Sequence, residues 1–164
     1  MPTTATVLAT LVDPAAGLRV DATLGSGFEV RYDTAEAGDA RAGPSPTETL
    51  LGALAACAAM DVASILRKKR QRVLGYQIAV TAERADEHPR VFTSITIEHR
   101  VSGDVEPEAL RRSVELSALA YCPVNAMLSA AVRVEHRYAL RRGGELPEAA
   151  ALVTVTGPRR SPVS

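Results

Sequence analysis

Residues 43–70 form the stretch of sequence that most constrains the fold. They read GPSPTETLLGALAACAAMDVASILRKKR and predict one long helix that is apolar on almost every side. Ser45 is a good N-cap, Pro46 suits the first helical position, and Glu48 completes an S-x-x-E capping box. The basic residues at the far end complement the negative end of the helix dipole. The boundaries of this helix are therefore marked at both ends.

A helix that is apolar nearly all round must be buried nearly all round. Its uninterrupted apolar run, Leu50 to Met60, ends at Asp61 and is far shorter than the roughly 20 residues that span a membrane. We therefore expect a core helix and no membrane association. One small sheet covers only one side of such a helix, so we also expect a symmetric homodimer that buries two of these helices together.

Composition places the chain among ordinary soluble domains. Its 164 residues are 46% hydrophobic and 23% charged with zero net charge, and aromatic residues are sparse, with no Trp. Nothing here favours a nucleic-acid partner, and the basic run RKKRQR is read as a solvated helix end. The N-terminal segment predicts no signal peptide. Two cysteines without an export signal favour thiol chemistry in the cytoplasm over a structural disulfide.

The remaining pattern predicts an α+β fold. A hairpin bent at Gly25-Ser-Gly27 is expected before the long helix, and Gly75 marks a turn after it. Alternating apolar residues then predict an antiparallel pair of strands. Strands without βαβ alternation indicate α+β, with one domain over 1–140 and a tail or edge strand over 141–164. The expected strands are 4–12, 18–32, 76–84, 91–101 and 132–140.

A second helix is expected from about Asp104 or Glu106 through Tyr121. Proline disfavours a helical conformation for the residue before it, so Cys122-Pro123 should end this helix and start a short new one. Cys122 then lies at a helix start. Two interpretations stay open: the thiol is an N-cap in place of Ser, or the free N–H groups and the dipole favour its thiolate.

The other polar candidates have structural and chemical interpretations of their own. Cys57 is either an inert core cysteine or a reactive thiol. Asp61, one turn later, is either a carboxylate bonded to a group of the partner chain or a polar wall of a thiol pocket. His99 and His136 are expected to be hydrogen-bonded core histidines, and no metal-ligand spacing is apparent among the three His and two Cys.

The helix 43–70, the segment PRVFTSITIEHRVSG and the ending AYCPVNAML together resemble the OsmC/Ohr superfamily. The resemblance covers about residues 43–140. It implies an intertwined α+β homodimer, in which antiparallel sheets surround two central helices and the active sites lie at the dimer interface. In the peroxidase branches, the positions of Cys57 and Cys122 hold the peroxidatic and the resolving cysteine. The resemblance implies no cofactor and no metal.

The implied activity is reduction of organic hydroperoxides by a thiol. A Cys57 thiolate would attack the O–O bond and become a sulfenic acid, Cys122 would condense with it, and an external dithiol would reduce the disulfide. The peroxidase branches also carry a Glu directly after the helix-opening proline, paired with an activating Arg. Here that position is Thr47, and Glu48 lies about 100° further round the helix. Arg19, from the N-terminal strands, is the candidate cation.

Two other functional classes are compatible with the same residues. One is a non-catalytic dimer that holds a small hydrophobic ligand and uses its thiols as redox sensors. The other is a structural protein in which both cysteines are inert. A cation in contact with Cys57 would distinguish the peroxidase from the ligand-binding or redox-sensing dimer, because a buried thiol without one reacts slowly.

Overall fold

A computed structural model describes residues 4–12, 17–34, 40–143 and 146–158. The chain divides into two compact units, residues 1–51 and residues 52–164, and each is described by itself. Helix α1 begins in the first unit and continues into the second. The described residues contain both helices and sheets, so the predicted α+β class is confirmed.

The first unit contains a three-stranded antiparallel sheet in the order β1-β2-β3. The turn from β2 to β3 is the hairpin that the sequence predicts: the Leu24 amide donates to the Phe28 carbonyl at 2.8 Å, and Gly27 has a φ of 87°, which glycine adopts readily. Its strands are β1 (Val7–Leu11), β2 (Val20–Leu24) and β3 (Glu29–Tyr32).

Helix α1 (Pro46–Lys68) starts with the predicted capping box. The backbone N–H of Ser45 donates to Glu48 Oε2 at 2.8 Å, and the backbone N–H of Glu48 donates to Ser45 Oγ at 3.3 Å. Each residue thus satisfies a backbone donor that the helix itself leaves unpaired. The sequence-based start of this helix is confirmed.

A smaller part of the surface of α1 is buried than its composition predicts. Within the chain only one stripe is fully buried, formed by Leu54, Ala58, Val62 and Leu66, while Met60 on another side is 72% exposed. Helix α1 is long and apolar enough to resemble a membrane-spanning helix by length and composition only, a test that core helices also pass, and 22% of its most apolar window is buried. The homodimer that would cover the other sides stays a prediction.

The second unit is built on a four-stranded sheet in the order β4-β5-β6-β7. β5 pairs antiparallel with β4, as predicted, but parallel with β6. The sheet is therefore mixed, and the expectation of an antiparallel sheet is wrong for the β5–β6 pair. The reason is the helical crossover between β5 and β6, which returns the chain to the same end of the sheet. The strands are β4 (Arg72–Arg84), β5 (Phe92–Asp104), β6 (Arg133–Arg141) and β7 (Ala149–Thr156).

Gly75 lies inside β4 rather than in a turn before it, so that expectation is wrong. A bulge between Val73 and Gly75 breaks the register, and a Cβ at Gly75 would come within 2.6 Å of Ser102 Oγ. Glycine is therefore needed here because the neighbouring strand approaches closely, not because the chain reverses. At the other end of the chain, β7 is an edge strand within the segment 141–164.

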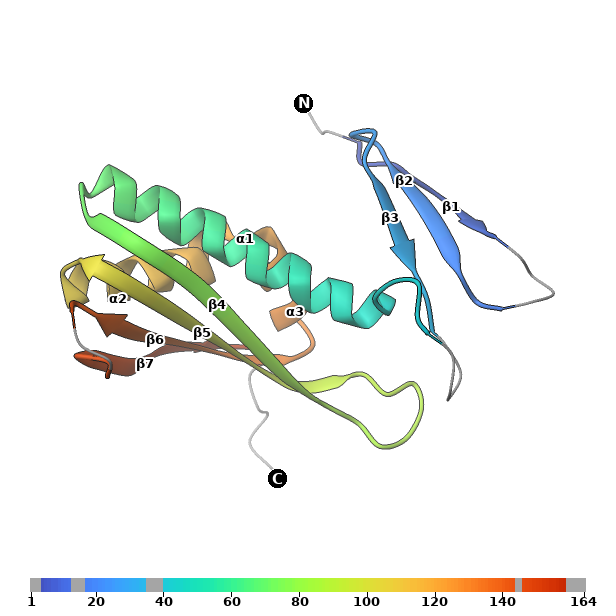
Figure 1. Cartoon of the computed structure of the whole chain (residues 1–164). Helices are drawn as coiled ribbons and strands as arrows, with labels where there is room; N and C mark the ends of the chain where they lie inside the picture. Colours follow the sequence, from blue (N-terminus) through green and yellow to red (C-terminus); the bar gives the residue numbers. More distant parts are fainter. Residues whose placement is uncertain (1–3, 13–16, 35–39, 144–145, 159–164) are drawn as a thin grey trace, which may run out of the picture. The chain divides into compact units, whose positions relative to one another are not determined.

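The crossover consists of α2 (Pro107–Leu116), the π-helical turn η1 (Ser117–Tyr121) and α3 (Pro123–Ser129). The predicted break is confirmed, because Cys122 is extended, with φ −73° and ψ 103°. Figure 1 shows α1 and α2 on the same face of the four-stranded sheet. The core contains residues of both helices and of the sheet, and Val62 and Leu66 of α1 and Leu110 and Val114 of α2 are fully buried in it.

Candidate active site

Three reactive side chains meet between α1 and the start of α3. The Sγ atoms of Cys57 and Cys122 and a carboxylate oxygen of Asp61 all lie within 4.8 Å of one another. Both cysteines are free thiols. Cys57 is half-buried, whereas Cys122 is 3% exposed. The structure therefore brings together two thiols that lie far apart in the sequence, with the more accessible one on the long helix.

Asp61 joins this cluster because it lies one helical turn after Cys57, on the same side of α1. Its carboxylate accepts a hydrogen bond from Ser117 Oγ at 3.1 Å. The bonded group thus belongs to the same chain, whereas the structural interpretation of the sequence placed it on the partner chain. Ser117 begins the π-helical turn η1, a position that no periodicity of the sequence indicates.

Cys122 is the N-cap of α3, as one of the two interpretations proposed. Its Sγ accepts a hydrogen bond from the backbone N–H of Asn125 at 3.3 Å. Burial raises the pKa of Cys122 to about 12, assisted by the neighbouring Cys57 thiol and Asp61, while the Asn125 N–H acts in the opposite direction. The Asn125 N–H favours the thiolate, as the other interpretation proposed, but burial has the larger effect on this pKa, so the role of Cys122 stays a prediction.

Asn125 supports the Cys122 side of the site and was missed by the sequence analysis. Its side-chain N–H groups donate to the Ala118 carbonyl at 2.8 Å and to Thr156 Oγ1 at 3.3 Å. Its side-chain oxygen lies 3.2 Å from Nε2 of His136. Asn125 is fully buried, so these partners fix its position and with it the first turn of α3. A histidine and a threonine from the sheet thus hold the backbone that contacts Cys122.

His99 and His136 are hydrogen-bonded core histidines, as predicted. Tyr76 Oη lies 2.6 Å from Nδ1 of His99, and both histidines are at most 1% exposed. Burial, and then the charge of His136, lower the pKa of His99 to about 3, and burial lowers the pKa of His136 to about 4. Burial and then the charge of Asp61 raise the pKa of Tyr76. Both imidazoles are therefore neutral at pH 7.

The other predicted site residues belong to the first unit. Arg19 is exposed just before β2, and its carbonyl accepts a hydrogen bond from the Val12 amide at 2.9 Å. Glu48 caps α1 and forms an ion pair with Arg41 at 3.5 Å. Within the described ranges of the chain, no Arg or Lys forms an ion pair with Asp61. The activating role of Arg19 and Glu48 stays a prediction.

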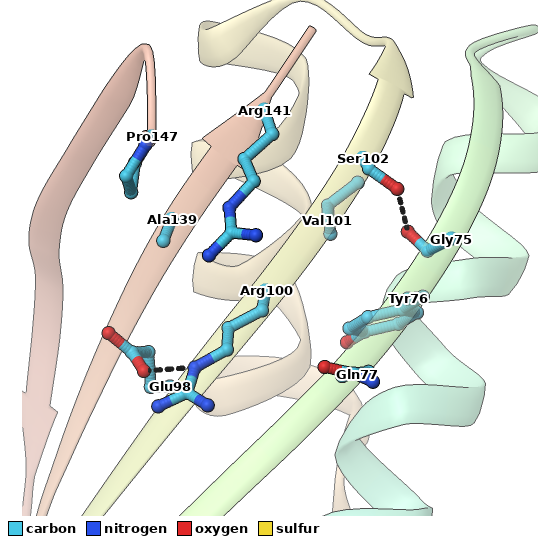
Figure 2. A pocket seen from close by; sticks show the side chains of 10 residues that line it. All are labelled: Gly75, Tyr76, Gln77, Glu98, Arg100, Val101, Ser102, Ala139, Arg141 and Pro147. Atoms are coloured by element: carbon cyan, nitrogen blue, oxygen red, sulfur yellow. Dashed lines mark hydrogen bonds and ion pairs between the residues drawn. The ribbon is translucent and has the colours of Figure 1, made fainter. Parts of the chain in front are cut away.

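A separate cavity of about 500 Å³ lies along the strands β4, β5 and β6 (Figure 2). Arg100 and Arg141 reach toward it, and Arg100 donates to Glu98. Neither cysteine is among the residues that line it. This cavity holds no nucleophilic thiol, so the candidate active site is the cluster of Cys57, Asp61 and Cys122.

The family model described as OsmC-like protein matches residues 37–137, which include both cysteines. The chain belongs to the OsmC family. Protein YhfA of Escherichia coli strain K12 is 46% identical over 96 residues, which are 58% of this chain and 72% of YhfA. The superfamily membership that the resemblance predicted is thereby confirmed.

Several solved structures have the same fold as this chain. A hypothetical protein from Aquifex aeolicus VF5 has a TM-score of 0.72 at 28% identity, covering 87% of this chain and 100% of that one. The organic hydroperoxide resistance protein OhrB of Bacillus subtilis has a TM-score of 0.57 at 17% identity, covering 86% of this chain and 98% of its own. At that lower identity, the likeness of OhrB concerns the fold alone.

Proposed function

We propose that this OsmC protein is a thiol peroxidase that reduces organic hydroperoxides, with Cys57 as the peroxidatic and Cys122 as the resolving cysteine. The observation that carries the proposal is the meeting of the two free thiols, whose sulfur atoms lie within 4.8 Å. A disulfide needs an S–S bond of about 2.05 Å, so the two sulfur atoms would have to move closer together to form it. The name of OhrB supports the substrate class.

The surroundings of the two thiols suit them to different steps of the reaction. The half-buried Cys57 meets the peroxide, and its thiolate attacks one oxygen of the O–O bond. The other oxygen leaves as an alkoxide, takes a proton and departs as an alcohol, and Cys57 becomes a sulfenic acid. The buried Cys122 then attacks this sulfur and gives up its thiol proton to the departing hydroxyl group. The S–S bond forms as water leaves.

The last step of the cycle is reduction of the disulfide by a separate molecule. An external dithiol attacks the Cys57–Cys122 disulfide, becomes oxidised itself and restores both thiols. The dithiol supplies the two electrons that the peroxide consumes, so no cofactor is needed. Apolar residues surround Cys57 on α1, and they favour an alkyl hydroperoxide over hydrogen peroxide. We place this activity in a homodimer in the cytoplasm.

The test is consumption of tert-butyl hydroperoxide and of hydrogen peroxide by the reduced protein with a dithiol as the reductant. We expect turnover with the organic peroxide, faster than with hydrogen peroxide. Cys57→Ser should abolish it, and Cys122→Ser should stop after one equivalent with a sulfenic acid that dimedone labels. Consumption no faster than that of free cysteine would reject the peroxidase, and the ligand-binding or redox-sensing dimer would replace it.

A further inference from the structure

Cys57, Asp61 and Cys122 also form a set of metal-ligand side chains that the sequence analysis did not anticipate. We propose that the reduced site binds one divalent cation of the Zn²⁺ class through Cys57 Sγ, Cys122 Sγ and a carboxylate oxygen of Asp61. The proposal needs only the reduced thiols, so it does not rest on the peroxidase activity. The metal ion would bind the same two sulfur atoms that the peroxidase reaction uses, so metal binding would affect that reaction.

The distances fit a small cation after limited adjustment. Zn–S bonds of about 2.3 Å and Zn–O bonds of about 2.0–2.2 Å place neighbouring ligand atoms of a tetrahedral site roughly 3.3–3.8 Å apart. The three ligand atoms already lie within 4.8 Å of one another. Shifts on the order of 1 Å would bring them to the spacing of a tetrahedral site.

The ligands come from elements that fix their spacing. Cys57 and Asp61 are one turn apart on α1, and residues four apart on a helix can hold one metal ion between them. Cys122 approaches from the start of α3, where its Sγ accepts the N–H of Asn125. Two of the donors thus lie on one regular helix and the third is held by a hydrogen bond.

Supporting hydrogen bonds also orient the carboxylate. Ser117 Oγ donates to Oδ2 of Asp61, which leaves Oδ1 for a metal ion. Metal-bound carboxylates are commonly held by such outer hydrogen bonds, which set their direction. Asn125, which supports Cys122, is itself fixed by His136 and Thr156. Hydrogen bonds therefore position both Asp61 and Cys122 before any cation binds.

The donor atoms select the class of metal. Two thiolates and one carboxylate suit Zn²⁺, whereas Mg²⁺ and Ca²⁺ take oxygen ligands only. Three protein ligands leave a fourth position for water or another small ligand. On binding, each thiol releases its proton to solvent, and two thiolates with one carboxylate balance the cation to a net charge of −1. No electrons are transferred.

Metal binding and the disulfide exclude each other, because both use Sγ of Cys57 and Sγ of Cys122. A bound cation would hold both thiolates apart from each other, and formation of the S–S bond would release the cation. The state of the site would then depend on both the supply of metal and the supply of oxidant. Loss of the metal on oxidation is therefore part of the proposal.

Co²⁺ is the probe, because its spectrum reports thiolate ligation directly. Metal-free, reduced protein should bind one Co²⁺ per chain, with a thiolate-to-metal charge-transfer band and visible d–d bands, and Zn²⁺ should displace it. Cys57→Ser and Cys122→Ser should each lose about half of the charge-transfer intensity. Asp61→Asn should keep the band but weaken binding at least tenfold. His88→Ala, an exposed histidine, should bind like the parent protein.

Several outcomes would overturn the site. They are the absence of a charge-transfer band, a band unchanged in both cysteine variants, and full affinity in Asp61→Asn. Should a variant fail to fold, alkylation of the parent protein's thiols, or their oxidation to the disulfide, must abolish the band, and a persisting band rejects the proposal. A protein that binds Co²⁺ in this way but consumes no peroxide would reject only the peroxidase. Turnover without the band would reject only the metal site.

Discussion

Tyr76 Oη lies 2.6 Å from Nδ1 of His99, and the other ring nitrogen of His99 is buried without a hydrogen-bond partner among the described residues. Among the described residues, only one of the two ring nitrogens of His99 thus has a hydrogen-bond partner. A proton added to it would create a charge that burial and the nearby His136 both disfavour. We therefore expect the fold to be sensitive to acid.

We expect stability to fall as the pH is lowered from about 6.5 to about 4. In the unfolded chain both histidines take up a proton near pH 6.5. In the folded protein the pKa of His99 is about 3 and that of His136 about 4, so protons bind preferentially to the unfolded state. Each histidine therefore removes up to about 1.4 kcal/mol of stability per pH unit in this range. Urea unfolding at a series of pH values measures this slope.

His99→Gln should flatten the slope, because glutamine stays neutral yet still offers Tyr76 a hydrogen bond. The matched control is His88→Gln, an exposed histidine of the β4–β5 turn, which should leave the slope unchanged. An identical slope in His99→Gln and the parent protein would show that His99 is not the acid-sensitive group.

Oxidation should convert the two thiols into one intramolecular disulfide. One equivalent of an organic peroxide should lower the mass by two hydrogens and yield one cross-linked peptide that contains Cys57 and Cys122, because the two sulfur atoms lie within 4.8 Å. The check is peptide mass spectrometry without reduction. Overoxidised Cys57 alone, or disulfides between chains, would mean that Cys122 does not resolve the sulfenic acid.

The capping box gives a way to separate the two roles suggested for Glu48. Ser45→Ala should lower the free energy of unfolding by about 1 kcal/mol, because it removes the cap that Ser45 Oγ provides to the Glu48 amide. Glu48→Gln keeps an oxygen for the Ser45 amide and removes only the charge. We expect it to be nearly as stable as the parent protein by urea unfolding. If the peroxidase rate of Glu48→Gln also stays unchanged, Glu48 caps the helix and does not activate Cys57.

The protein should be an obligate dimer. Only one stripe of α1 is buried in the chain, and apolar side chains such as Met60 remain exposed on its other sides. A surface of this kind is more stable when a second copy covers it. Sedimentation at micromolar concentration should show only the dimer, and a stable folded monomer would contradict this prediction. Met60→Glu should weaken the dimer, whereas Lys68→Glu at the exposed helix end is the control.

Local signals predicted much of this structure, and distant pairings did not. Ser45 with Glu48, and Cys122 before Pro123, are fixed by neighbours in the sequence, so their effects on the helices could be predicted. The bond from Ser117 to Asp61 joins residues that only the folded chain brings together. The parallel pairing of β5 with β6 likewise depends on where a helical crossover returns, which strand periodicity does not encode.

The last prediction concerns the cation that the proposed peroxidase reaction requires. Asp61 lies close to both thiols, and its negative charge helps to raise the pKa of Cys122. A guanidinium beside Cys57 would offset this charge, and Arg19 is the candidate because the activating arginine of the peroxidase branches comes from the N-terminal strands. Arg31 is held by Asp21 in two hydrogen bonds of 2.7 and 2.9 Å, so it is the matched control.

Arg19→Ala should slow consumption of organic peroxide at neutral pH by about tenfold or more, since losing 1.4 kcal/mol of thiolate stabilisation changes the thiolate fraction tenfold. Above pH 9 the difference should shrink, because an ordinary thiol is then largely ionised without help. Arg31→Ala should match the parent protein throughout. Initial rates across pH 6–10 measure both variants. If Arg19→Ala follows the parent profile at every pH, another cation activates Cys57, and the remaining Arg and Lys residues become the candidates.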